Sequence, residues 1–378
     1  MAVQNNTRLH HSHKEEEMNT GAVLVGDAFW GDSGKGKGAA WLALMYSAQI
    51  VLRGGGGPNA EHGIFVGEHY VRTNQLPLSW ILAGCPIAIG SGTAVDPVKL
   101  LSEMERFGLG SDRVHIDPRC PIVESRHIAQ EVADADMEAI GSTKSGTGAT
   151  LVEFLRRGEE VRQAKDVPQL APLIQDVVVL SNKLARDGVV VVEDGQGFWL
   201  SSRYGEYPNV TSKNCTTGAM IDAIGLGWRL IGEVWLMVKS KPTREGKGGM
   251  GKCRELTLKE MRRRGLVEAS SIGGVPRRKV DGIDFDLLKY AVMVNAPTHI
   301  ALTFAEHHDP EVSGVTSADK LTPKTRELIA RVERETGVPV GMVDTGKQFN
   351  HVVSIPPTMP IPELDEKTLA RLASYVGR

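Results

Sequence analysis

Residues 22–45 read AVLVGDAFWGDSGKGKGAAWLALM, and this stretch decides the fold. Its first five residues, Ala22–Gly26, are an apolar run typical of a buried strand, and the apolar run from Gly38 to Met45 indicates a helix. The turn between them is rich in glycine, and residues 31–37 match the pattern GxxxxGK. Main-chain N–H groups of such a loop, at the start of a helix, can bind phosphate. The stretch therefore predicts a strand, a phosphate-binding loop and a helix.

Similar apolar segments recur along the chain and alternate with helical patterns. We expect further strands at 49–53, 87–89, 113–116, 188–193, 234–238, 299–303 and 338–343, helices at 124–139, 173–186 and 322–336, and a loop at 141–150. The run GVVVVE at 188–193 is apolar on both faces, which is typical of a parallel sheet covered by helices. The alternation predicts an α/β, P-loop-like nucleotide-binding fold with a mostly parallel central sheet and loop insertions.

One catalytic domain is expected at 21–355, between a disordered tail at 1–20 and a C-terminal extension at 356–378. The 378 residues are 41% hydrophobic and carry a net charge of -2, which excludes a disordered chain and a generic polyanion-binding protein. No apolar run approaches the roughly 18 residues of a membrane span, and residues 1–20 lack the apolar region of a signal peptide. We therefore expect a cytoplasmic protein with no nucleic-acid or membrane partner. The four widely spaced cysteines are expected to be free thiols.

The loop departs from the usual phosphate-loop pattern at position 38. Glycine stands there in place of the Ser or Thr whose hydroxyl normally binds Mg²⁺, so a metal ligand must come from elsewhere. Asp32, inside the loop, is the candidate. Lys35 and Lys37 add positive charge that suits a phosphate group.

Further motifs follow this loop in a fixed order. They are GGPNAEH (56–62), IGSTKSGTG (140–148), EDGQGFWLS (193–201), YPNVTSKNCTTG (207–218), RRKVDGIDF (277–285) and GVPVGMVDTG (337–346). With WGDSGKGK (30–37), this series resembles the motifs of the adenylosuccinate synthetase family over about residues 22–353. Its length and spacing are similar to those of the short, archaeal type of that family.

The resemblance implies a purine-biosynthetic, carbon–nitrogen ligase that works in two steps. A base removes the N1 proton of a 6-oxopurine nucleotide, and O6 attacks the γ-phosphate of a nucleoside triphosphate. The amine of L-aspartate then displaces phosphate from C6. Developing charge on the transferred group calls for Mg²⁺, lysine and main-chain donors. The resemblance also implies a homodimer.

Roles for individual residues follow from the motif match. The catalytic residues would be Asp32 as base, His62 as acid and Lys35 at the γ-phosphate, and the metal ligands Asp32 and the Glu61 carbonyl. The triphosphate would contact Gly31, Ser33, Gly34, Lys35, Gly36, Lys37, Glu306, Thr345 and Gly346. The monophosphate would contact Ser33, Asn59, Ser142, Thr143, Gln196 and Thr211, with Arg157 reaching a neighbouring subunit's nucleotide. L-Aspartate would contact Gly274, Arg277 and Arg278.

Three departures from the family pattern bear on the substrates. In this sequence Ser33 replaces the glutamate of the family's loop. GGVPRRK (273–279) replaces the family's aspartate-binding TTGRRRR, and TFAE (303–306) replaces its guanine-reading TKLD. Ser33 opens volume and offers an acceptor for a 2-amino group, while Glu306 is one methylene longer than the aspartate that reads guanine. This pattern resembles a bacteriophage branch of the family that condenses dGMP with aspartate, a step in making DNA that contains 2-aminoadenine. The resemblance implies ATP or dATP as the phosphate donor and the cytoplasm of the host cell as the location.

Other functions stay open at this point. The first alternative is an archaeal-type adenylosuccinate synthetase that uses IMP and GTP. A regulatory GTPase is disfavoured, because the loop hydroxyl and an NKxD motif are absent from the sequence. A catalytically inactive binding protein would be expected to lose Asp32 or His62, and both are present.

Overall fold

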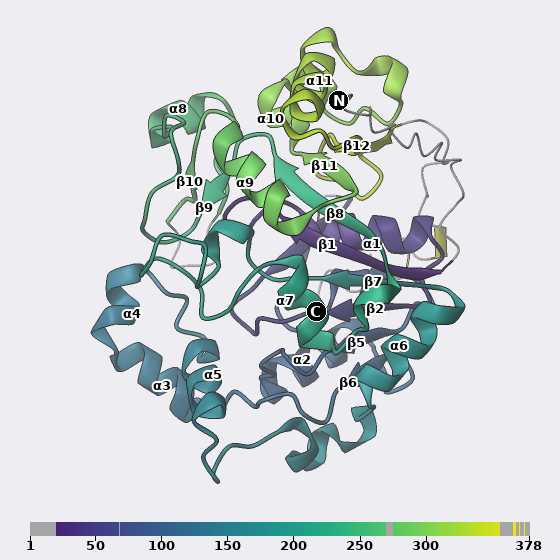
Figure 1. Cartoon of the computed structure of the whole chain (residues 1–378), viewed down its shortest axis with the longest axis vertical. Helices are drawn as coiled ribbons and strands as arrows, with labels where there is room; N and C mark the ends of the chain where they lie inside the picture. The colour runs from purple at the N-terminus through teal and green to yellow at the C-terminus, as the bar shows by residue number, and fades with distance from the viewer. Residues whose placement is uncertain are drawn as a thin grey trace, which may run out of the picture.

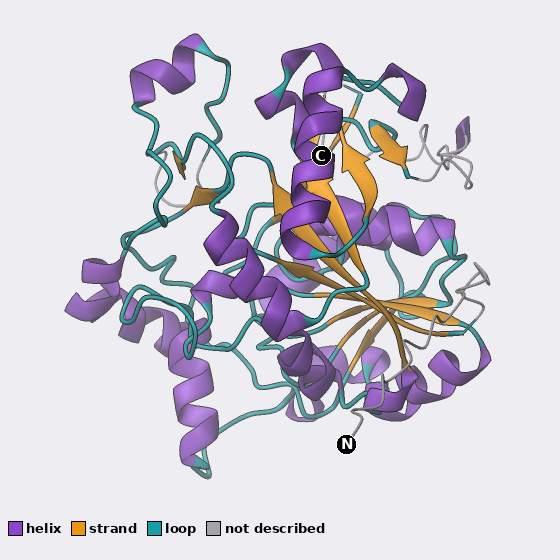
Figure 2. Cartoon of the chain, turned by 45° about the horizontal axis from the view of Figure 1, so that its top comes forward, coloured by secondary structure: helices purple, strands orange, loops and turns teal. Residues whose placement is uncertain are grey.

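A computed structural model describes residues 20–67, 69–269 and 275–355, together with positions 366, 367, 370 and 374. Its centre is one twisted nine-stranded sheet (Figures 1 and 2). The strand order is β13 (Val352–Ser354), β12 (Val340–Asp344), β11 (His299–Thr303), β8 (Ile231–Lys239), β1 (Gly21–Asp27), β7 (Val189–Glu193), β2 (Ile50–Arg53), β5 (Ile87–Ile89) and β6 (Val114–Ile116). All neighbours are parallel except β13, which runs antiparallel to β12. The predicted α/β fold with a mostly parallel sheet is confirmed.

Helices cover both faces of the sheet, which explains why its strands are apolar throughout. In β1, Val23 and Val25 pack in the cluster that contains residues of α1 (Lys35–Met45), whereas Ala22 and Leu24 face α6 (Val177–Asp187) and α7 (Thr217–Ile224). Successive side chains of a strand point to opposite faces, so a strand buried on both sides must be apolar at every position. A third cluster joins β11 and β12 to α9 (Phe285–Asn295) and α11 (Pro323–Thr336).

The predicted helix at 124–139 is wrong as a single element. The structure has α3 (Ser125–Ala133) and α4 (Ala135–Ile140), separated by Asp134 in an extended conformation. The Asp134 carboxylate accepts a hydrogen bond from the N–H of Asp136, so it caps the second helix and ends the first. The predicted loop at 141–150 ends at Gly146, where α5 (Thr147–Arg156) begins, and the helix predicted at 173–186 begins at Val177, after the Asp176 cap.

Two small antiparallel pairs escaped prediction. They are β3 (His62–Val66) with β4 (His69–Thr73), and β9 (Thr243–Arg244) with β10 (Arg278–Lys279). The remaining helices are α2 (Pro97–Phe107), α8 (Leu258–Arg263) and α10 (Ala305–His308). No helix in the described part is long and apolar enough to span a membrane. The predicted tail and nearly all of the C-terminal extension lie outside the described residues.

Candidate active site

A cavity of about 750 Å³ lies against the loops that follow β1, β2, β7 and β8. Carboxyl ends of parallel strands meet at one edge of a sheet, and ligands of open α/β sheets bind outside that edge. Most of the residues predicted for the site line this cavity: Gly31, Asp32, Ser33, Gly34, Lys35, Gly36, Asn59, Glu61, His62, Ser142, Thr143, Gln196, Thr211 and Arg277. The structure therefore brings together residues from six separate sequence motifs.

Other predicted residues do not line the cavity. These are Lys37, Arg157, Arg278, Glu306, Thr345 and Gly346, and Gly274 lies outside the described residues. Arg157 is an exposed residue at the end of α5, and Arg278 forms a bidentate ion pair with Glu255.

Lys37 acts as an internal link in this structure. Its ammonium group donates to Asp344 Oδ1 at 2.6 Å and to the carbonyls of Gly346 and His351 at 2.8 and 3.3 Å. These three acceptors use the three N–H groups of a lysine. Lys37 thus joins α1 to the loop after β12, a role that the sequence pattern did not predict.

The loop after β1 is organised by Asp27, the last residue of that strand. Its carboxylate accepts from the Phe29 N–H at 2.7 Å, from the Ser33 hydroxyl at 2.5 Å and from Lys35 Nζ at 3.1 Å. Asp27, Ser33 and Lys35 are all buried. Because the Ser33 hydroxyl gives its single proton to Asp27, its oxygen lone pairs remain available as acceptors.

Asp32 is held in a strained, charged setting. Its φ of 56° lies in the left-handed region, its carbonyl accepts from Lys239 Nζ at 2.8 Å, and its carboxylate lies 2.9 Å from Arg277 Nε. Burial raises the pKa of Asp32 to about 6, against the opposing effect of Arg277. A carboxylate whose pKa lies this close to neutrality suits a proton acceptor.

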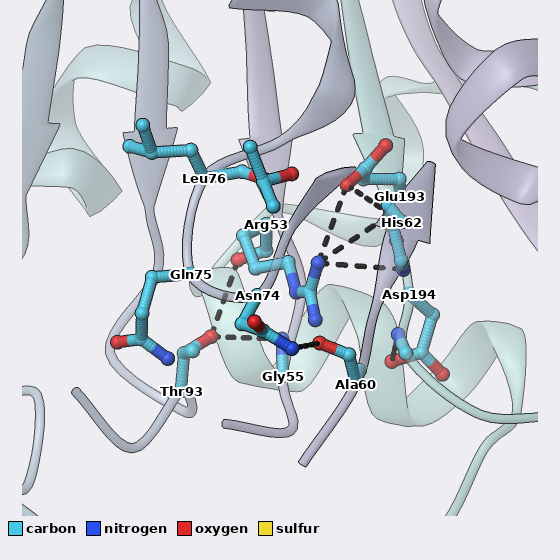
Figure 3. A network of polar contacts seen from close by, with 12 residues as sticks. Arg53, Gly55, Ala60, His62, Asn74, Gln75, Leu76, Thr93, Glu193 and Asp194 are labelled. Carbon is cyan, nitrogen blue, oxygen red and sulfur yellow. Dashed lines mark hydrogen bonds and ion pairs between the residues drawn. The ribbon is translucent and has the colours of Figure 1, made fainter. Parts of the chain in front are cut away.

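His62 forms a buried triad with Glu193 and Arg53. Figure 3 shows the Arg53 guanidinium directed at both partners, and His62 Nδ1 lies 2.8 Å from Glu193 Oε1. Burial lowers the pKa of His62, and the nearby Glu193 carboxylate opposes this effect. Burial alone would raise the pKa of Glu193, but His62 and Arg53 hold the pKa of Glu193 below its usual range. The carboxylate therefore fixes Nδ1 as the ring nitrogen that carries a proton and leaves Nε2 as an acceptor, 3.4 Å from Arg53 Nη1.

Two amide side chains on the cavity wall have buried atoms without a partner. They are Oδ1 of Asn59 and both Oε1 and Nε2 of Gln196, whose φ is 62°. A buried polar atom without a hydrogen bond costs about 1–3 kcal/mol, so such atoms mark places where a ligand completes the bonding. An amide presents both a donor and an acceptor, as nucleobase recognition requires.

Five residues that contribute to the site were missed. They are Asp27, Glu193, Lys239, Arg244 and Glu268, of which the last two line the cavity. Glu193 is the first residue of the motif EDGQGFWLS (193–201), but no role was predicted for it. Asp27 and Lys239 each end an apolar strand, and a charged residue at the carboxyl end of a buried strand was the available signal.

No cluster of three or more His, Cys, Asp or Glu side chains with the geometry of a metal site occurs in the described part of the chain. Mg²⁺ needs no such cluster, because it is commonly held by one or two protein oxygens together with substrate phosphates and water. The Asp32 carboxylate and Glu61 lie on the same cavity wall, so the available oxygen donors fit Mg²⁺ bound with a triphosphate.

Comparison with known proteins shows the family of this chain. The model of the adenylosuccinate synthetase family matches residues 23–165 and 155–309. Adenylosuccinate synthetases of Thermococcus onnurineus and Pyrococcus horikoshii are both 37% identical, over 336 and 337 residues, covering 88% of this chain and 97% and 98% of theirs. The chain belongs to the adenylosuccinate synthetase family. As such it is a ligase that forms a carbon–nitrogen bond with aspartate, and family substrates are a nucleoside monophosphate, aspartate and a nucleoside triphosphate.

Solved structures show the same synthetase fold. A fully ligated adenylosuccinate synthetase of Plasmodium falciparum has a TM-score of 0.80 at 20% identity, covering 89% of this chain and 99% of that one. The succinoaminodeoxyadenylate synthetase of cyanophage S-2L, bound to dGMP and to dATP as an energy donor, has a TM-score of 0.76 at 22% identity, covering 95% and 99%. At these identities the likeness concerns the fold.

Proposed function

We propose that this synthetase condenses dGMP with L-aspartate, driven by ATP or dATP, to give N6-succino-2-amino-2′-deoxyadenylate. The observation that carries the proposal is the state of Ser33. Its hydroxyl proton is engaged by Asp27 at 2.5 Å, while the residue lines the cavity beside Asp32. The remaining lone pairs suit the 2-amino group of guanine, which IMP lacks, and a glutamate at this position would fill the space with a charged group.

The first chemical step is proton removal from N1 of the purine by Asp32. The electron pair moves to O6, which attacks the γ-phosphorus, and the nucleoside diphosphate leaves. A neutral His62 that donates from Nδ1 to Glu193 has an acceptor at Nε2, so its acid role requires the ring to gain a proton as anionic substrates bind. In the second step the aspartate amine adds to C6, the O6 phosphate leaves with the C–O bond electrons, and the proton that the amine loses ends on the departing phosphate.

Mg²⁺ would neutralise charge on the phosphates, held by the Asp32 carboxylate and the Glu61 carbonyl. Lys35 supplies positive charge at the start of α1, where main-chain N–H groups also point towards the loop. Arg277, on the same wall as Asp32, suits a carboxylate of L-aspartate because a guanidinium can bind a carboxylate in a bidentate manner.

Glu306 supports an adenine nucleotide as donor. Burial and the nearby Asp344 raise the pKa of Glu306 to about 8, so its carboxyl group is mainly protonated at pH 7. A neutral carboxyl offers one donor and one acceptor, which match N1 and the 6-amino group of adenine. Guanine presents two donors at N1 and N2 and needs an ionised carboxylate. Oε2 of Glu306 is buried and has no partner in the described part.

The second candidate is the ordinary reaction with IMP and GTP. It is favoured by the archaeal adenylosuccinate synthetases, which are 37% identical to this chain over nearly their full length. Both candidate functions give Asp32, His62 and Arg277 the same roles. They differ in the roles that they give to Ser33 and Glu306. We place the enzyme in the cytoplasm, in that of a host cell if a phage encodes it, and we infer a homodimer in which Arg157 reaches the partner's monophosphate.

An assay matrix tests the proposal. Purified enzyme is incubated with dGMP, GMP or IMP, each combined with ATP, dATP or GTP, in the presence of aspartate and Mg²⁺. The products are identified by mass spectrometry. We expect the succino product from dGMP with ATP or dATP. Turnover of IMP with GTP and none of dGMP would establish the second candidate instead.

The Ser33→Glu variant sharpens the matrix. It should lower kcat/KM for dGMP at least about 10-fold more than for IMP, because only dGMP carries the 2-amino group. General damage to the loop would lower kcat/KM for dGMP and for IMP alike, so it would leave the ratio of the two unchanged. An equal loss for both substrates would show that Ser33 does not distinguish them.

A further inference from the structure

A cluster of charges contacts Asp32, and Arg277 is its one member to which the chemical steps above give a role. We define the Glu268 cluster as Glu268, Lys239, Lys279, Arg277 and His307. Lys239 ends β8, Arg277 and Lys279 lie at β10, His307 is in α10, and Glu268 follows α8. Lys239 and Lys279 are 1% and 0% exposed, whereas Glu268 and Arg277 are partly buried and line the cavity. The two lysines therefore depend on Glu268 as a counter-ion inside the protein.

Lys239 connects the cluster to the catalytic loop. Its ammonium group donates to the Asp32 carbonyl at 2.8 Å, to Thr243 Oγ1 at 3.0 Å and to Glu268 Oε2 at 2.6 Å, and it lies 4.1 Å from the centre of the Phe304 ring. All three N–H groups are engaged. The bond to the Asp32 carbonyl holds the peptide of a residue whose φ is 56°, a conformation that non-glycine residues avoid unless their surroundings impose it.

Glu268 connects the same lysine to the basic segment that carries Arg277. Its main-chain carbonyl accepts from the Arg277 N–H at 3.0 Å, and its carboxylate lies 4.0 Å from Arg277 Nη1. The other carboxylate oxygen pairs with Lys279 and lies 3.6 Å from His307 Nδ1. One side chain thus joins the loop of the predicted base to the segment predicted to bind aspartate.

The charges of this region balance only when Glu268 is present. Asp32, Glu245 and Glu268 face Lys239, Arg277 and Lys279, three carboxylates against three cations. Without the Glu268 charge, two buried lysines would lose their counter-ion and repel each other. Leaving buried charges uncompensated is strongly unfavourable, so both lysines would shift, and the Asp32 peptide would lose its support.

We propose that Glu268 is a positioning residue for both steps of the reaction, which holds the Asp32 peptide through Lys239 and the Arg277 segment through direct contacts. This inference rests on the proposed function for the roles of Asp32 as the base and of Arg277 in binding aspartate. The buried side-chain atoms Asn59 Oδ1 and Gln196 Oε1 and Nε2 form no hydrogen bond with the described residues, the cluster included, and binding through them should be unaffected.

The test uses Glu268→Gln, which keeps the side chain's size and removes its charge. Glu260→Gln is the matched control, because the Glu260 carboxylate accepts from the Thr257 N–H at the start of the nearby α8 and pairs on the surface with Arg254. Phosphoryl transfer alone is followed by positional isotope exchange within the triphosphate, with monophosphate present and aspartate absent, using whichever monophosphate the wild type accepts. Steady-state kinetics give the KM for aspartate.

We expect Glu268→Gln to slow isotope exchange and kcat by about 100-fold each, the cost of a small misplacement of a catalytic group. KM for aspartate should rise about 10-fold, while KM for the monophosphate stays within about 3-fold of wild type. Glu260→Gln should match wild type. Unchanged isotope exchange with a raised aspartate KM would overturn the proposal, since Glu268 would then serve only Arg277.

A measurement that needs no turnover separates this inference from the proposed function. Hydrogen–deuterium exchange of peptides covering 27–38 and 275–281 should be faster in Glu268→Gln than in wild type and unchanged in Glu260→Gln. Equal protection of both peptides in all three proteins would overturn the inference whatever the substrates are. A lowered melting temperature with unchanged kinetics per folded enzyme would likewise reduce Glu268 to a purely structural residue.

Discussion

The cavity has two unlike walls. The wall at the sheet edge consists of buried, paired groups: Ser33 and Lys35 on Asp27, and His62 on Glu193. The outer wall comes from α3, α4, α5, the turn at 141–145 and residues 207–212. Thr143 and Tyr207 are exposed there, and α4 buries no residue. The sheet edge can hold groups within tenths of an ångström, as proton and phosphoryl transfer require, whereas the outer wall can adjust around a substrate.

The largest effect is expected from Asp32→Asn at the sheet edge. The amide cannot accept the N1 proton, so kcat should fall about 10³-fold, with KM for the monophosphate within about 3-fold. Steady-state kinetics measure both values, and Asp286→Asn, which alters an exposed ion pair with Lys252, serves as control. A variant that retained more than a tenth of wild-type kcat would exclude Asp32 as the base.

Glu193→Gln should reduce kcat by about 10²-fold. An amide still fills the space, but it neither fixes the His62 tautomer nor counteracts the effect of burial on the imidazole pKa. The histidine should therefore titrate at lower pH than in wild type, which NMR of the ring protons measures. An unchanged histidine titration with lowered activity would mean that Glu193 acts through Arg53 instead.

Donor preference should depend on pH through Glu306. Its raised pKa of about 8 means that the carboxyl is protonated below pH 8 and ionised above it. Moving from pH 7 to pH 9, kcat/KM for ATP relative to GTP should fall about 5-fold, because the ionised group loses its donor for adenine N1. Beside burial, Asp344 raises the pKa of Glu306, and Lys37 and Lys239 lower it.

Glu306→Gln provides the comparison for this prediction. The amide keeps one donor and one acceptor at every pH, so the ATP-to-GTP ratio should become independent of pH between 7 and 9. A ratio that changes equally in wild type and Glu306→Gln would show that another group controls the donor.

The smallest effect is expected on the outer side, from Arg157→Ala. KM for the monophosphate should rise about 5-fold with kcat within 2-fold, as for loss of one contact to a phosphate group. Mixing Arg157→Ala subunits with Asp32→Asn subunits tests the dimer. In a hybrid dimer with shared sites, one site would combine Asp32 of the first variant with Arg157 of the second and would therefore be intact. Absence of any activity beyond the sum of the two variants would argue against a shared site.

Much of the sheet-edge wall was predictable. A strand, a glycine-rich loop and a helix at 22–45 specify a phosphate-binding turn through local apolar pattern and backbone freedom alone, and Gly34 takes a φ of 79° there. Glu193 and Lys239 were not predicted to act, since a charged residue next to an apolar run has no visible partner until strands are ordered. The hairpin β3–β4 was also missed, because its alternation is too short to separate from a loop.

The sequence alone determined the α/β class, the phosphate-binding loop and the membership in a synthetase family, because these depend on local patterns and ordered motifs. The tertiary structure alone decided that Lys35 meets Asp27 while Lys37, two residues on, joins α1 to the loop after β12. It also decided that Glu268 lies between Lys239 and Arg277. Such choices depend on which distant segments the sheet order brings together, and a charge finds its partner only once burial has removed water from around it.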